Sequence, residues 1–215
     1  MLNPFVFHTR YHLVKILGRR AKNPVELLEG IREAPSASIY YHTHRFLQQH
    51  HYMSPEPPND FGYWISNILN LKDLGESMAS VDTVSFSDLE NLRNAYVEIL
   101  DKYIKAGNHM VDSRPGEEFQ FTSCISFIAP TPYVAHNLRE FTQILGHISV
   151  HSLYFHFFEA RLRLNRDAND FSVWLRDLGE AELAEKISQM DPYTITLEGL
   201  RKKIITLVRS KYARN

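Results

Sequence analysis

Two serine–histidine pairs carry the side chains whose type and spacing could do chemistry. Ser38 and His42 are four residues apart, as are Ser152 and His156, and a tyrosine lies inside each pair. Positions i and i+4 of a helix share one face, so each pair would present a hydroxyl and an imidazole together. We expect a ligand-binding set of Ser38, Tyr40, His42, His44, Ser152, Tyr154 and His156.

A structural interpretation competes with this one. The hydroxyl and the imidazole of each pair could simply hydrogen-bond each other within a packed aromatic helix. If the two halves of the chain instead pack about a local two-fold axis, His42 and His156 would face each other across a groove.

A divalent metal ion is a second possibility for the histidines. His147 and His151 are four residues apart and could chelate one, but a site also needs a third ligand and usually a carboxylate. The candidate ligands are His42, His147, His151, His156 and Glu159, with Asp60 as a further ligand or base. No His-Glu-x-x-His or Glu-x-x-His motif is present, so a metal cofactor is possible but not favoured.

Other reaction classes lack their motifs. The sequence has no glycine-rich phosphate loop and no Gly-x-Ser-x-Gly elbow. Cys124 is the only cysteine, which excludes an internal disulfide, and its alternating apolar surroundings predict a packed thiol.

The elements that would position these residues are suggested by an internal repeat. At an offset of 114 residues the first half matches the second, and the match resumes after a short deletion. The matched blocks include Phe5–Phe7 with Phe119–Phe121, Ser38–His42 with Ser152–His156, and Asn59–Trp64 with Asn169–Trp174. We expect one copy over 5–100, a linker over 101–118 and a second copy over 119–208, packed as one pseudo-symmetric unit.

Helix signals recur in both copies. Asn23, Asn59, Asn137 and Asn169 are placed as N-caps of helices, and apolar residues repeat at three- and four-residue steps before the end of each copy. Only the opening Phe-x-Phe segments, roughly 4–16 and 118–129, have the two-residue alternation expected of strands. The fold class predicted is mainly α, an internally duplicated helical domain with about five helices per copy and at most a short strand at the start of each.

Composition limits the partners. The chain has 215 residues, 44% of them hydrophobic, and a net charge of -1, which is typical of a globular protein and argues against nucleic acid. No apolar run is long enough for a membrane span, and no signal peptide is evident, so we expect a cytoplasmic protein. A homo-oligomer is possible.

The repeated Asn-Asp-Phe-x-x-Trp blocks and the histidine- and tyrosine-rich segments at 40–50 and 152–162 resemble a bacterial and archaeal family of domains of unknown function. The likeness covers nearly the whole chain. It implies a self-contained module of this length and no particular chemistry.

Three functions follow as hypotheses. We favour a binding or regulatory module in which a groove lined by histidine and tyrosine, between two related halves, receives a small ligand or a protein partner. The alternatives are a metal-dependent enzyme that uses the histidine cluster with Asp60 or Glu159, and a carbohydrate-binding module. The last requires exposed rings at Trp64, Trp174 or Tyr63, whereas the spacing of both tryptophans predicts core positions.

Overall fold

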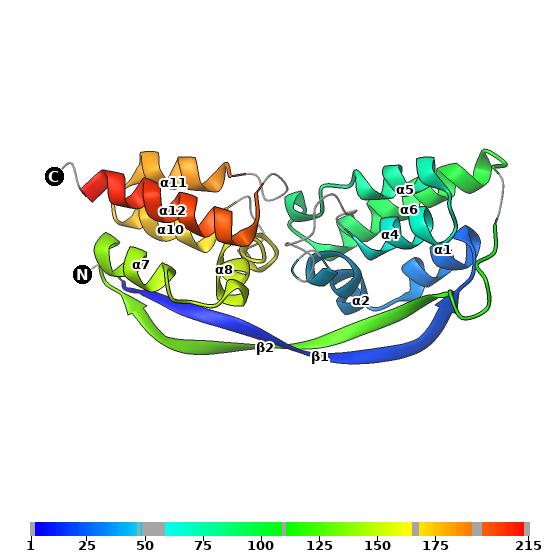
Figure 1. Ribbon diagram of the computed structural model, residues 1–215, viewed down its shortest axis with the longest axis horizontal. Helices are drawn as coiled ribbons and strands as arrows, with labels where there is room; N and C mark the ends of the chain where they lie inside the picture. The colour runs from blue at the N-terminus through cyan, green and yellow to red at the C-terminus, as the bar shows by residue number, and fades with distance from the viewer. Residues whose placement is uncertain are drawn as a thin grey trace. The chain divides into compact units, whose positions relative to one another are not determined.

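The computed structural model describes residues 3–46, 48, 59–108, 111–164, 168–190 and 195–212. Contacts divide the chain into two compact units: unit 1 is Met1–Tyr11 with Ser126–Asn215, and unit 2 is His12–Ile125. In each unit, helices lie on one face of two long strands (Figure 1). The expected copies at 5–100 and 119–208, joined by a linker at 101–118, are each continuous in sequence. The boundaries between the two observed units instead fall inside the two long strands.

The two strands are the largest departure from expectation. β1 (Phe5–Ala21) and β2 (Phe119–Ala135) are each 17 residues long and form a two-stranded antiparallel sheet (Figure 1). The prediction of a mainly α, internally duplicated helical domain with at most short strands is therefore wrong, because this sheet is a main element of both units.

The reason for the error lies in the burial of the strands. Only their first residues alternate between buried and exposed, and in β1 the run from Leu13 to Ile16 is exposed on both faces. A strand without one buried face shows no two-residue period. In β2, Pro130 and Pro132 also argue against a strand in the sequence, because within sheets proline is confined to edge strands.

The strand openings pack against helices that are distant from them in the sequence. Phe5 begins β1 but belongs to unit 1, where its ring lies 5.4 Å from that of Phe171. Phe119 begins β2 but belongs to unit 2, where its ring lies 5.3 Å from that of Phe61. Each opening segment thus completes the core of the helices contributed by the other half of the chain.

Unit 2 contains α1 (Pro24–Glu33), α2 (Ser36–Tyr40), the π-helical turn η1 (Tyr41–Arg45), α4 (Asp60–Asn67), α5 (Lys72–Ala79), the 3-10 turn η2 (Thr83–Ser85) and α6 (Leu89–Lys105). As expected, α1 and α4 begin at asparagine caps: Asn23 accepts from the Glu26 amide at 3.0 Å and Asn59 from the Gly62 amide at 2.8 Å. α6 closes the unit, with Leu92, Tyr96 and Leu100 fully buried.

Unit 1 contains α7 (Leu138–Leu145), α8 (Val150–Phe157), α9 (Ala160–Leu164), α10 (Asp170–Asp177), α11 (Ala181–Ser188) and α12 (Leu197–Tyr212). Asn137 and Asn169 cap α7 and α10, again as expected. No helix in the described part of the chain has the length and apolarity needed to cross a membrane.

Candidate functional site

In unit 2, Ser38 and His42 both form hydrogen bonds with the backbone of one residue of β2. The Ser38 hydroxyl donates to the carbonyl oxygen of Thr122 at 2.8 Å, and the Thr122 amide donates to Nε2 of His42 at 2.9 Å. The other ring nitrogen, Nδ1, lies 2.6 Å from Oδ2 of Asp60, the first residue of α4. Because Nε2 accepts, Nδ1 carries the proton and donates it to the carboxylate.

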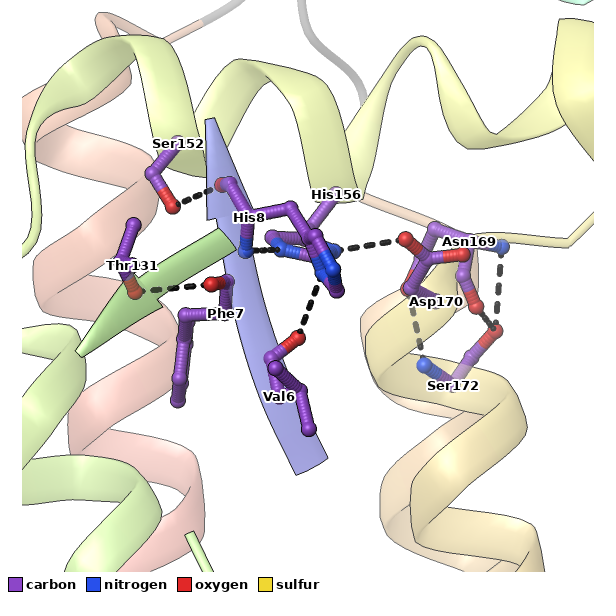
Figure 2. A network of polar contacts seen from close by, with 9 residues as sticks. All are labelled: Val6, Phe7, His8, Thr131, Ser152, His156, Asn169, Asp170 and Ser172. Carbon is purple, nitrogen blue, oxygen red and sulfur yellow. Dashed lines mark hydrogen bonds and ion pairs between the residues drawn. The ribbon is translucent and has the colours of Figure 1, made fainter. Parts of the chain in front are cut away.

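In unit 1, Ser152 and His156 form the same two hydrogen bonds with the backbone of one residue of β1 (Figure 2). The Ser152 hydroxyl donates to the carbonyl oxygen of His8 at 2.6 Å, and the His8 amide donates to Nε2 of His156 at 2.7 Å. Nδ1 of His156 lies 2.6 Å from Oδ2 of Asp170, the first residue of α10. We call these two arrangements the strand clamps.

Each clamp acts as a substitute for a neighbouring strand. The strand residue that it holds has its amide and its carbonyl group satisfied by side chains one helical turn apart, and buried backbone groups require such partners. The Ser–His spacing places the two side chains on one side of the helical segment, but they do not bond each other as the structural interpretation predicts. They bond the same strand residue.

The imidazoles of the clamps are packed among aromatic rings. His42 is 1% exposed, and its ring centroid lies 4.7 Å from that of Phe119 and 5.4 Å from that of Phe61. His156 is 3% exposed and lies 4.9 Å from the ring of Phe5. A general base needs a ring nitrogen that reaches a substrate proton, and in both clamps the unprotonated nitrogen faces a backbone amide instead.

The remaining members of the expected ligand-binding set are buried. Tyr40 stacks on His44 in unit 2 at 5.7 Å, and its hydroxyl lies 3.4 Å from Nε2 of His12. His44 belongs to the π-helical turn η1, a rare conformation that often marks functional sites. In the same turn, burial and then the charge of Asp60 raise the pKa of Tyr41. Tyr154 in unit 1 is 1% exposed.

The expected metal ligands are not brought together among the described residues. His42 belongs to unit 2 and the other four to unit 1. His147 and His151 are exposed, and Glu159 is buried in an ion pair of 2.8 Å with Arg10. No group of three or more histidine, cysteine, aspartate or glutamate side chains suited to a metal ion occurs in the described ranges. Cys124 is buried, as predicted.

The tryptophans confirm the prediction of core positions. Trp64 and Trp174 are 5% and 6% exposed, and their indole nitrogens donate to the backbone carbonyl groups of Glu117 and Asn3. Stacking of a sugar needs an open ring face. The carbohydrate-binding alternative thus keeps only Tyr63, which is 38% exposed.

A hollow of about 400 Å³ opens beside the clamp of unit 1. We call it the unit 1 hollow. Its lining comes from four elements or their flanks: Pro4, Phe5, Val6 and His8 at β1, Ile128 in β2, Phe155 and His156 in α8, and Asp170, Val173, Trp174 and Asp177 in α10. Only His156 belongs to the set expected from sequence. The sequence indicates Trp174 only for the carbohydrate-binding alternative. The other lining residues carry no sequence signal, because nothing in the sequence indicates that residues 4–8 pack beside residues 170–177.

The fold and the site together define a two-unit protein with mixed α and β structure. In each unit, a Ser–His pair on the helices hydrogen-bonds the opening segment of the strand that comes from the other half of the chain. The chain belongs to a family of unknown function, DUF5752, whose model matches residues 2–209. It is also similar to the solved structure of OrfY from Thermoproteus tenax, with 28% identity over 96% of this chain and 94% of that chain and a TM-score of 0.81. No curated protein matches the sequence.

Proposed function

We propose that this protein is a binding module that receives a small ligand in the unit 1 hollow, and that its strand clamps are structural. The observation that carries the proposal is the double engagement of each clamp imidazole. In His156, Nδ1 bonds Asp170 and Nε2 accepts the His8 amide, so the ring is occupied in holding β1. This supports binding over acid–base catalysis at the histidines.

The dimensions and the lining of the hollow support the ligand part of the proposal. Its volume of about 400 Å³ falls in the range of small-molecule sites. Aromatic and aliphatic walls combine there with a few polar groups, the mixture that such sites use for affinity and orientation. Since one wall is the opening of β1, a bound ligand would further stabilise the strand segment that the clamp holds. Ligand binding would thus change the stability of the β1 opening, and this change is how a ligand would regulate the protein.

The proposal is tested by filling the hollow. Val173 is half-buried and lines it, so Val173→Trp should occupy the space, whereas Val25→Trp places the same side chain on an exposed helix position of unit 2. We would screen the wild-type protein by thermal shift with amines, carboxylates, sugars, nucleotides and phosphates. Compounds that raise the melting temperature should lose the effect in Val173→Trp and keep it in Val25→Trp. Compounds that act equally on both variants, or a panel without any effect, would refute the proposal.

A further inference from the structure

The strand β1 has an open edge in unit 2. A sheet of two strands leaves one outer edge on each strand. In unit 2 the outer edge of β2 is held by the clamp at Thr122, whereas the clamp of β1 lies in unit 1, at His8. Within the described ranges, no loop or helix bonds the backbone of Leu13–Ile16. This part of β1 therefore offers donors and acceptors to a further strand.

The corresponding edge in unit 1 is less suited to pairing. There the outer edge of β1 is held by its clamp, and β2 carries Pro130 and Pro132. Proline has no amide donor for a neighbouring strand, and it occurs on edges that stay unpaired. The edge of β1 in unit 2 is thus the one that combines an open backbone with a full set of donors.

Alternation along β1 shows which backbone groups point outward. His8 directs its amide and carbonyl group toward the clamp side chains, and hence away from β2. Every second residue of an antiparallel strand faces the same way, so Val14 and Ile16 also direct their backbone groups outward. Gly18 has a φ of 74°, outside the extended region, so the regular edge ends before this residue.

The side chains beside this edge are apolar and exposed. Leu13, Val14 and Ile16 are 60%, 49% and 62% exposed. Successive side chains of a strand point to opposite faces, so a partner on one face would cover only part of this set, whereas a strand added at the edge contacts both faces. Two copies would bring together about 600 Å² of exposed side chain, and the paired backbones raise this toward the roughly 1,000 Å² of the smaller specific interfaces.

The segment is complementary to itself in an antiparallel register. A two-fold axis at Val14 places this residue opposite its own copy, and Leu13 opposite Lys15 of the second copy. The two lysines then avoid each other, whereas an axis at Lys15 would set them directly opposite, which is unfavourable. An axis at Ile16 would require pairing of Gly18, which lies beyond the regular edge. The register at Val14 meets both conditions.

We propose that a second copy of this chain pairs antiparallel with β1 across His12–Ile16, with the two-fold axis at Val14. The pairing joins two sheets of two strands into one sheet of four and covers the exposed apolar side chains. It is independent of the unit 1 hollow, because all of these residues belong to unit 2. The small area predicts a dimer that dissociates on dilution.

Sedimentation velocity of the full chain, from about micromolar to about millimolar concentration, measures the association. Leu13→Lys and Leu13→Glu remove the same apolar contact but place opposite charges beside Lys15 of the second copy. We expect Leu13→Lys to raise the dissociation constant at least about tenfold, and Leu13→Glu to bind at least about fivefold more tightly than Leu13→Lys. Val25→Lys, on an exposed position of α1, should leave association unchanged.

Disulfide trapping tests the register and does not depend on the charge variants. Residues opposite each other in a hydrogen-bonded pair have Cα atoms about 5.5 Å apart, within the range of a disulfide. Val14→Cys should therefore form a covalent dimer on mild oxidation. Ile16→Cys lies on the same strand and is more exposed, but the two copies of residue 16 would be more than about 10 Å apart and should not be linked. Cys124 is buried and stays in both variants.

Three results would overturn this inference. Wild-type protein that is monomeric at every concentration would show that no second copy binds. Equal association of Leu13→Lys and Leu13→Glu would show that Lys15 does not lie opposite residue 13. Equal disulfide yields from Val14→Cys and Ile16→Cys would indicate random collision in place of a fixed register. The wild-type and cysteine measurements decide the matter even if the charge variants fail to fold.

Discussion

Replacing His42 with phenylalanine separates the hydrogen bonds of a clamp from the packing of its ring. Phenylalanine keeps an aromatic ring among Phe61 and Phe119, but it offers neither an acceptor for the Thr122 amide nor a donor for Asp60. His42→Phe therefore measures the hydrogen bonds of the clamp alone. An alanine substitution would also create a cavity, and the cost of the cavity would add to that of the lost hydrogen bonds.

The magnitude follows from the burial of the groups left behind. A buried donor without a partner costs about 1–3 kcal/mol, and Thr122 is 9% exposed. The bond to the carboxylate is charge-assisted, but the side chain of Asp60 is 30% exposed, so water replaces much of what is lost. We expect a destabilisation of about 2–4 kcal/mol for His42→Phe, and about 1 kcal/mol for Ser38→Ala, which removes one hydroxyl bond.

Urea unfolding of the Trp174→Phe protein provides the measurement, because its remaining tryptophan, Trp64, lies in the same unit as this clamp. Both substitutions act on Thr122, so their effects should be non-additive in a double-mutant cycle. A cost below that of Ser38→Ala, or additive effects of the two substitutions, would show that the imidazole does not hold the strand. A chemical role for His42 would then have to be considered again.

Two further predictions concern packing and pH. Burial raises the pKa of Tyr96, so the folded state keeps the phenol protonated while the unfolded state ionises near pH 10; stability is complete below that pH and is lost as pH rises above it. In Tyr96→Phe, the fall in the free energy of unfolding above pH 10, measured with urea, should be shallower by up to about 1.4 kcal/mol per pH unit; an unchanged slope would contradict the assignment. A Cβ atom on Gly30 would meet the ring of Phe121 at 2.1 Å, so Gly30→Ala should cost about 1–3 kcal/mol in the same assay. Gly199→Ala, where the nearest atom is a threonine hydroxyl at 3.3 Å, should change stability by less than about 1 kcal/mol, and similar costs at the two sites would count against this packing.

The features that depend on near neighbours in sequence were predictable. Helix starts at Asn23, Asn59, Asn137 and Asn169 follow from side chains that accept the amide three residues later. The burial of Trp64 and Trp174 follows from apolar spacing within one helix. Both kinds of signal are local, so they do not depend on the path of the rest of the chain.

The features that depend on distant pairing were not predictable. His42 and Thr122 are 80 residues apart, and His8 and His156 are 148 apart. The pattern of the two Ser–His pairs shows which helix face they share, but not what lies opposite that face. For the same reason His8 and Asp177 carry no local signal, although both line the unit 1 hollow.

The clamps compensate for the low stability and the uncertain register of a two-stranded sheet. A two-stranded sheet is marginally stable alone, and a slip of one residue would turn Phe5 and Phe7 from the core to the solvent. Each clamp bonds the amide and the carbonyl of one chosen residue, His8 or Thr122, and so fixes the register of a strand opening against helices far away in the sequence. Histidine suits this task because one ring supplies an acceptor for the strand and a donor for the aspartate at the next helix start. The histidines thus specify the fold.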